Sequence, residues 1–133
     1  MTTVAPRPPR DNLTPAFAYL RRLPGMDDAA VREAVTALVT FSADQGLSLS
    51  CVHYEERSRE RLATWMEIIT SCRSEGVTDI LVPSPDHFHH DPAVATYMRE
   101  ELAEKIRGTV WLASEAAATD QTAQAVQADD HDR

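Results

Sequence analysis

The chain has 133 residues, of which 43% are hydrophobic and 26% are charged, a composition typical of one folded domain and not of a fibrous or wholly disordered protein. The formal net charge is -8 and the only lysine is Lys105, so the chain lacks the clustered basic residues of a broad nucleic-acid-binding surface. It also lacks an apolar run of about 18 residues and an apolar leader at its start, which favours a cytoplasmic protein that does not contact a membrane.

The two ends of the chain differ in composition from the middle. Residues 1–14 are rich in proline, arginine and threonine, and we predict a flexible arm there. From Ser114 the chain has no apolar stripe, and from Glu115 to Arg133 it has five acidic residues and one basic residue. We therefore predict a disordered acidic tail over 114–133 and a single folded domain over 15–113.

The first two elements of the domain are a strand and a helix. The apolar run "AFAYL" at 16–20 follows a proline and precedes two arginines, which is typical of a buried strand. The stretch 27–45 has the spacing of an amphipathic helix, with Asp27 or Asp28 as its cap and Gly46 after its end. Its predicted apolar face consists of Val31, Val35, Leu38, Val39 and Ser42.

A second strand and helix follow. Residues 47–54 alternate in polarity, with Leu47, Leu49, Cys51 and His53 on one face, which indicates an edge strand. Ser58 is placed to cap a helix that runs to about Ser74. The predicted apolar face of that helix is Leu62, Trp65, Met66, Ile69 and Cys72. Because Cys51 and Cys72 both lie in apolar patterns, we expect two buried free thiols and no disulfide.

The last elements are a strand at "TDILVP" (78–83), a helix after Asp91 and a strand at "TVWLA" (109–113). Asp91 is the expected helix cap, Pro92 the first helical residue, and Gly108 the stop. The predicted apolar face of this helix is Val94, Tyr97, Met98, Leu102 and Ile106.

Strands thus alternate with helices, and this alternation predicts an α/β domain of three layers with a mostly parallel, four-stranded sheet. Placing the alternating strand at the edge gives the order 2-1-3-4, which is flavodoxin-like. In such sheets, ligands bind at the carboxyl ends of the strands. Arg21, Arg22 and the segment 83–90 are predicted to meet at that edge.

The segment "PSPDHFHHDP" (83–92) carries three of the five histidines of the chain. His87, His89 and His90 are weak candidates for metal ligands, because their spacing is not that of a helical pair and no cysteine is nearby. We favour a polar loop that leads into a helix. Asp86 and Asp91 could form an acid/base pair, but Asp91 is better explained as a helix cap. Phosphate-binding glycine motifs, the nucleophile elbow and the C-x-x-C motif are absent, so we expect no cofactor.

With these elements placed, the chain resembles the N-terminal catalytic domain of the serine recombinases, the resolvase/invertase family. Two motifs characterise that family: a first strand that reads Tyr-x-Arg-x-Ser and a later segment that reads roughly Leu-Asp-Arg-Leu-x-Arg. Tyr19 and Arg21 match the first motif, and Asp86 with the apolar Phe88 matches the second. Arg59 fits the arginine that opens the family's second helix, with Arg61 as an alternative. The resemblance spans about residues 16–113 and implies a resolvase-like domain.

The chain departs from the family at the residues that carry the chemistry. Leu23 stands where the family has its nucleophilic serine, and His87 and His90 stand where it has two arginines. Leucine has no hydroxyl for phosphodiester attack, and neutral histidine stabilises phosphate charge poorly. Ser84 is the one serine near the predicted edge, but nothing in the spacing places a base beside it. The family's long dimer helix and DNA-binding domain also have no counterpart after residue 113.

These observations predict a degenerate, non-catalytic domain that works by binding another protein, in regulation or as a remnant of a mobile element. Tyr19, Arg21, Arg59, Asp86 and His87 are then vestiges of a catalytic site. The alternative is a small enzyme acting on phosphodiesters with Arg21, Arg59, Asp86 and a histidine, which requires these side chains to converge. A response-regulator receiver is disfavoured, because arginines follow the first strand where that family has acidic residues.

Overall fold

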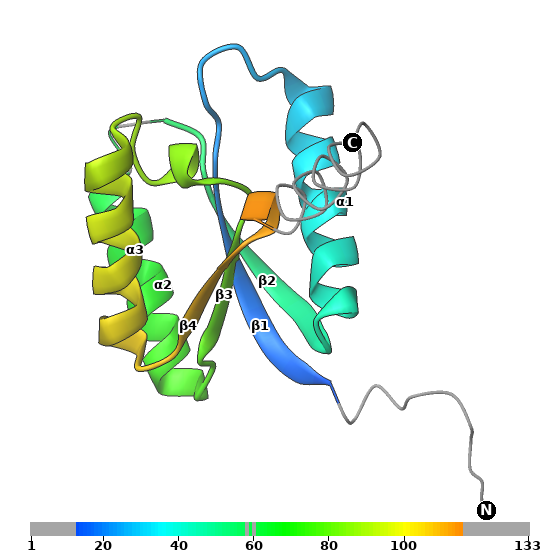
Figure 1. Ribbon diagram of the computed structural model, residues 1–133, viewed down its shortest axis with the longest axis vertical. Helices are drawn as coiled ribbons and strands as arrows, with labels where there is room; N and C mark the ends of the chain where they lie inside the picture. Colours follow the sequence, from blue (N-terminus) through cyan, green and yellow to red (C-terminus); the bar gives the residue numbers. More distant parts are fainter. Residues whose placement is uncertain (1–12, 58, 60, 116–133) are drawn as a thin grey trace, which may run out of the picture.

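The described residues, 13–57, 59 and 61–115 of this computed structural model, alternate between strands and helices (Figure 1). The four strands form one sheet in the order β2-β1-β3-β4, and every neighbouring pair is parallel. The predicted α/β class and strand order are therefore confirmed. The elements are β1 (Thr14–Arg21), α1 (Asp28–Asp44), β2 (Leu47–Glu55), α2 (Arg61–Glu75), β3 (Asp79–Val82), the short 3-10 helix η4 (Pro85–His87), α3 (Pro92–Ile106) and β4 (Thr109–Leu112).

Helices cover both faces of the sheet, with α1 on one side and α2 and α3 on the other (Figure 1). Strand β1 is central, and its residues from Ala16 to Leu20 are all buried, as expected for a strand covered on both faces. On the α1 side, β1 presents the small side chains Ala16 and Ala18, which pack with Leu38. On the other side it presents Phe17 and Tyr19, which join the larger core formed with α2 and α3. The sheet thus separates a small core from a large aromatic one.

The alternation predicted for 47–54 is interrupted by an irregularity in the pairing of β1 with β2. Ala16 pairs with Leu49, but the next residue of β1, Phe17, pairs with Cys51, so Ser50 is an extra residue in β2. Such a bulge shifts the following side chains to the opposite face of the strand. Leu47 and Leu49 pack with the α1 core, whereas His53 contacts Phe17 on the α2 side. The prediction of one shared face for Leu47, Leu49, Cys51 and His53 is therefore wrong.

The predicted apolar faces of the helices are correct only in part. Leu62 and Met66 of α2 are 72% and 52% exposed, and α2 instead buries Thr64, Ile68, Ile69 and Cys72. Tyr97 of α3 is 63% exposed, and that helix buries Ala95, Leu102 and Ile106. In both helices the sheet selects one of two adjacent apolar stripes, and the second stripe stays on the surface. On α1, Leu38 and Ser42 are buried as predicted, but Val39 is exposed.

Several sequence-based predictions concern residues at the limits of the described chain. The structure does not describe residues 1–12, which make up most of the predicted arm. It also does not describe Ser58, the predicted cap of α2, or residues 116–133, which make up most of the predicted tail. Thr14 already belongs to β1, and its amide donates to the Gly46 carbonyl at 3.2 Å. Ser114 and Glu115 are helical. Within the described ranges, no helix is long and apolar enough to cross a membrane.

Strand β4 lies at one edge of the sheet, where the Arg99 side chain of α3 reaches it. Arg99 donates two hydrogen bonds from its guanidinium to the Val110 carbonyl, at 3.1 and 2.8 Å. The same guanidinium forms a bidentate ion pair with Glu115, at 2.8 and 3.1 Å. This geometry uses the planar fork of arginine to join α3, β4 and the residues that follow β4.

Helix α3 begins as the sequence predicts, and this start can be tested. The Asp91 carboxylate accepts hydrogen bonds from the amides of Ala93 and Val94, at 2.9 and 3.4 Å, and Pro92 is the first helical residue. We expect Asp91→Ala to lower the free energy of unfolding by about 1 kcal/mol in urea titrations, because it leaves helix amides without acceptors. The matched control is Asp86→Ala, since Asp86 is exposed and caps nothing; equal effects of the two substitutions would contradict the assignment.

Candidate functional site

Polar residues collect where β1 and β2 end and where η4 follows β3. Arg21 is the last residue of β1, Glu55 is the last of β2, and His87 ends η4. Because these three strands are parallel neighbours, their carboxyl ends meet at one edge of the sheet, where ligands bind in doubly wound folds. This edge is the candidate site, and its central residues are Tyr19, Arg21, Glu55 and His87.

The centre of the site is the carboxylate of Glu55, which is only 1% exposed. Its Oε2 accepts a hydrogen bond from Nε of Arg21 at 2.8 Å, and its Oε1 accepts one from the Tyr19 hydroxyl at 3.2 Å. Burial, followed by the negative charge of Glu55, raises the pKa of Tyr19 far above its ordinary value. Tyr19 is therefore a neutral donor, and the buried charge of Glu55 is compensated by Arg21.

His87 lies beside Arg21 and is contributed by η4, the short helix that follows β3. It is 3% exposed, and its Nδ1 accepts a hydrogen bond from the backbone amide of Arg21 at 3.0 Å. Burial, and then the charge of Arg21, lowers the pKa of His87 to about 4. The ring is consequently neutral at physiological pH, with its proton on Nε2 because Nδ1 is the acceptor. A neutral ring in this position fixes η4 to β1 rather than supplying a positive charge.

An aromatic cluster beneath the site holds these elements together. The rings of Tyr19 and Phe88 are stacked with centroids 5.9 Å apart. Trp65 of α2 packs edge-on against both of them, with centroid distances of 6.2 Å in each case. Each aromatic contact of this kind stabilises a fold by roughly 0.5–1.5 kcal/mol, in addition to the stabilisation that comes from burying apolar surface. Phe88 thus anchors the loop after β3, and with it the position of His87.

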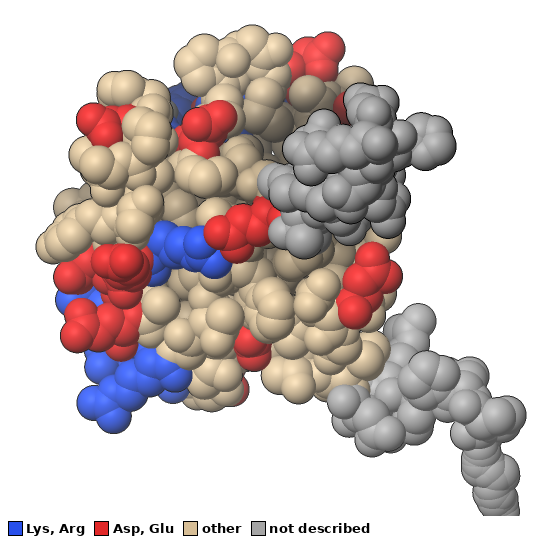
Figure 2. All heavy atoms as spheres, in the orientation of Figure 1, with Lys and Arg blue, Asp and Glu red and all other residues tan. Residues whose placement is uncertain are grey.

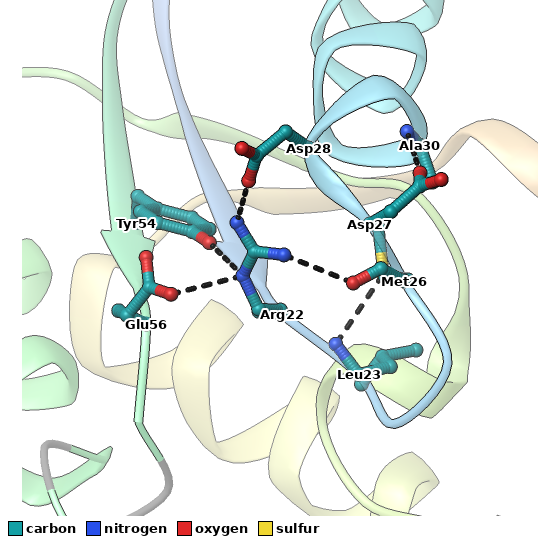
Figure 3. A network of polar contacts seen from close by, with 8 residues as sticks. All are labelled: Arg22, Leu23, Met26, Asp27, Asp28, Ala30, Tyr54 and Glu56. Carbon is teal, nitrogen blue, oxygen red and sulfur yellow. Dashed lines mark hydrogen bonds and ion pairs between the residues drawn. The ribbon is translucent and has the colours of Figure 1, made fainter.

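Arg22 forms a second polar network on the other side of the β1 end (Figure 3). Its Nε lies 3.0 Å from the Tyr54 hydroxyl and 2.9 Å from Oε2 of Glu56, both from the end of β2 and the residue after it. Its terminal nitrogens bond to the Met26 carbonyl at 2.9 Å and to the carboxylate of Asp28. The hydrogen bond from Arg22 lowers the pKa of Asp28. Arg22 therefore holds the loop between β1 and α1 against the end of β2.

The structure brings together three of the five residues that the recombinase resemblance selects. Tyr19, Arg21 and His87 are joined through the contacts described above. Asp86 is exposed, and within the described chain no hydrogen bond or ion pair connects it or Arg59 with Arg21. Arg59 instead lines a groove between α2 and α3. The contacts of the described residues thus do not join Arg21, Arg59 and Asp86, and the phosphodiester-enzyme alternative stays a prediction.

The remaining histidines of the segment 83–92 are used locally. The rings of His89 and His90 stack with centroids 4.3 Å apart, and Nδ1 of His89 accepts a hydrogen bond from the Asp91 amide at 3.0 Å. His87 points instead toward Arg21. Among the described residues, no group of three or more histidine, cysteine or acidic side chains is placed to hold a metal ion.

Glu55 is the residue of this site that sequence reasoning missed. It follows the alternating segment 47–54 directly, and acidic residues at such a position are usually solvent-exposed. The available signal was its place at the carboxyl end of a strand next to β1. The bulge at Ser50, which turns Glu55 inward toward Tyr19, is not apparent from the polarity pattern.

The chemistry available at this edge is limited by the protonation states of its groups. Neutral, buried Tyr19 is a poor nucleophile because its pKa is raised. The hydroxyl of Ser84, considered above as a substitute for the missing serine, forms no hydrogen bond to a base among the described residues. Leu23 lies in the loop after β1, where its amide donates to Sδ of Met26 at 3.3 Å. The arrangement supports structural pairing of charges and not activation of a nucleophile.

Comparison with known proteins adds no family to this picture. No protein-family model matches the chain, and no curated protein matches it. The resemblance to serine recombinases therefore stays a prediction that depends on the two short motifs.

The neutral state of His87 gives a pH dependence that can be measured. Its pKa is about 4 in the folded protein and near its ordinary 6.5 when unfolded, so the unfolded chain binds more protons between these values. Stability should fall as the pH is lowered through that window, by up to about 3 kcal/mol from this residue.

The His87→Asn variant is the control, because its Oδ1 can accept from the Arg21 amide but does not titrate. Urea titrations from about pH 7 to about pH 4 should show a smaller loss of stability in this variant than in the unmodified protein. Equal losses in the two proteins would show that His87 is not held neutral.

Proposed function

We propose that this chain is a non-catalytic domain that acts by binding another protein. The proposal is supported first by the candidate site, whose charged and polar groups are engaged with one another. Glu55 neutralises Arg21, and the Nδ1 lone pair of His87 is taken by a backbone amide. A catalytic site needs groups that are free to act on a substrate, and these groups already serve the fold.

The observation that carries the proposal is an apolar groove of about 530 Å³ between α2 and α3. Leu62 and Tyr97, which line it, are 72% and 63% exposed, so large apolar side chains from both helices face solvent there. Exposed apolar surface of this kind, bordered by charged residues, is typical of a protein-binding site. Its lining residues are Arg59, Arg61, Leu62, Trp65, Tyr97, Met98 and Glu101.

The charges beside the groove indicate the chemistry of its occupant. Neither Arg59 nor Arg61 forms an ion pair with another described residue, and the hydrogen bond of Arg61 goes to Sδ of Met98 at 3.3 Å. A segment with carboxylates beside bulky apolar side chains would satisfy both the arginines and the apolar lining. We therefore propose an acidic segment of a different protein that carries aromatic or aliphatic anchors.

The chain's own ends fit the groove less well. Residues 116–133 are acidic, but Val126 is their only large aliphatic residue and they have no aromatic residue. Residues 1–12 carry arginines and prolines, with Asp11 as their one carboxylate and no aromatic residue. A segment of a different protein can supply both the carboxylates and the bulky apolar side chains.

The distribution of charge argues against nucleic acid as the partner. On the face drawn in Figure 2, acidic side chains are spread over the surface and the basic ones do not form a continuous patch. With a net charge of -8, the protein would be repelled by phosphates at long range.

The non-catalytic part of the proposal is tested by incubating the full chain with supercoiled and linear DNA. We expect neither cleavage nor a protein-DNA adduct that survives denaturation, because Leu23 offers no nucleophile and Tyr19 is buried and neutral. Gel mobility and denaturing electrophoresis provide the measurement. A covalent adduct that is lost in Ser84→Ala would instead favour the phosphodiester enzyme.

The binding part is tested by selecting ligands from a displayed library of random peptides on the immobilised full chain. Selected peptides should combine large apolar residues with aspartate or glutamate. Their affinity should drop at least about tenfold for Leu62→Glu and for Tyr97→Glu, since a buried charge at a contact of this kind typically costs more than 1.4 kcal/mol.

The control is Val39→Glu, which places the same charge at a residue of α1 that is 50% exposed and lies across the sheet from the groove. Peptides that bind all these variants equally would show that the groove is not the site. A wild-type dimer that Leu62→Glu converts to a monomer would assign the groove to a second copy of the chain and overturn the proposed partner.

A further inference from the structure

A cysteine, a histidine and a glutamate form a line across β2 and α2, apart from the site described above. Sγ of Cys51 lies 3.7 Å from Nε2 of His53, and Nδ1 of His53 lies 3.5 Å from Oε1 of Glu67. His53 is 7% exposed, whereas Cys51 is accessible to solvent. The sequence predicted a buried Cys51, and the structure corrects this because the bulge at Ser50 alters the register of the strand.

The order of these three groups is that of a nucleophile, a base and a residue that orients the base. The position of Glu67 Oε1 beside Nδ1 of His53 favours the tautomer that carries its proton on Nδ1, and in that tautomer Nε2 can accept the thiol proton. The Phe17 ring packs against the imidazole with centroids 5.4 Å apart and restricts its rotation. The thiol proton can therefore pass to Nε2, and the resulting charge pair is stabilised by Glu67.

We propose that Cys51 is a reactive thiol that forms mixed disulfides with small disulfide compounds, with His53 as its base and Glu67 as the residue that positions His53. This activity goes beyond the proposed protein binding and does not depend on it.

The reaction is a thiol-disulfide exchange in which every atom is accounted for. Cys51 transfers its proton to Nε2 of His53, and the thiolate attacks one sulfur of the disulfide R–S–S–R. A new sulfur-sulfur bond forms to Cys51 while the original one breaks. The departing sulfur takes the proton from His53 and leaves as R–SH, so Cys51 is oxidised and half of the disulfide is reduced.

The surroundings of Cys51 indicate a small and flexible disulfide. Cys51 lines neither the groove between α2 and α3 nor the pocket beside Cys72, so no described pocket at the thiol selects a large substrate. The thiol lies instead on an edge strand, open to solvent. Glutathione disulfide, a flexible compound with an accessible sulfur-sulfur bond, is the appropriate probe.

The second cysteine of the chain is an internal control. Cys72 is 1% exposed, and burial raises its pKa to about 11. It has no histidine beside it among its described contacts, so it lacks both access and a base. The proposal therefore requires that Cys51 is modified and that Cys72 is not.

The other titratable groups near the Cys51 thiol are few. On β1, Tyr19 pairs with His53 across the strands and is kept neutral by burial. On α2, Glu67 contacts His53, and Cys72 and Glu75 lie further along the helix. Among these groups, His53 is the one whose ring nitrogen lies beside the Cys51 thiol.

The experiment follows the mass of the full chain during incubation with glutathione disulfide, with the modified residue located after proteolysis. The unmodified protein and Cys72→Ser should gain one glutathione at Cys51 at the same rate, and a small reducing thiol should remove it. Cys51→Ser should gain none. Modification mainly at Cys72 would overturn the proposal.

The role of His53 is tested by comparing rates at two pH values. At about pH 7, His53→Asn should react at least about tenfold more slowly, because the thiol has lost its base. At about pH 10, where an ordinary thiol ionises unaided, the two proteins should react at rates within about twofold. An equal rate at neutral pH, or the same slowing at both pH values, would overturn the role of His53.

A second pair of variants keeps the test valid if His53→Asn does not fold. Glu67→Ala removes the residue that orients the imidazole and should slow the reaction near neutral pH but not in alkali. Glu75→Ala removes another exposed acid of α2 and should leave both rates unchanged. If the two substitutions have the same effect, Glu67 does not position His53.

Discussion

The ion pair of Glu55 with Arg21 is the contact on which the carboxyl edge of the sheet depends. A carboxylate that is 1% exposed is tolerated only if its charge and its hydrogen-bonding capacity are satisfied, and here Arg21 and Tyr19 satisfy them. The same stretch of backbone donates to His87. The ends of β1 and β2 and the short helix η4 are thereby fixed to one another by groups that in another protein would be available to a substrate. Removing one partner of such a pair typically costs about 3–5 kcal/mol, because a buried charge is left alone.

The extra residue in β2 determines which side chains reach this centre. Without Ser50 as a bulge, the residues after Leu49 would keep the alternation of the first part of the strand, and His53 and Glu55 would face α1. The bulge turns them toward α2 and the aromatic cluster. One inserted residue therefore accounts both for the buried carboxylate at the end of the strand and for the line formed by Cys51, His53 and Glu67. Bulges commonly redirect side chains near functional sites in this way.

The sequence predicts the architecture well because periodicity, caps and glycine stops act locally. The strand order follows from the alternation of 47–54 and from connection rules, and the cap at Asp91 follows from its place before Pro92. The choice between adjacent apolar stripes on α2 and α3 is made by the sheet, and for this reason the helical spacing predicts Leu62 and Tyr97 in the core although both are exposed. Glu55 and the exposure of Cys51 could not be predicted, since both depend on the register between two strands.

Arg99 has a consequence for how copies of this protein can associate. Its guanidinium donates hydrogen bonds to the Val110 carbonyl of the edge strand β4 and forms an ion pair with Glu115. A foreign strand that approached β4 would have to displace a charged side chain before it could form a ladder of hydrogen bonds. This edge of the sheet is therefore protected against the open-ended stacking of molecules that leads to fibres. The protection depends on the ion pair of Arg99 with Glu115, a residue that lies after the end of β4.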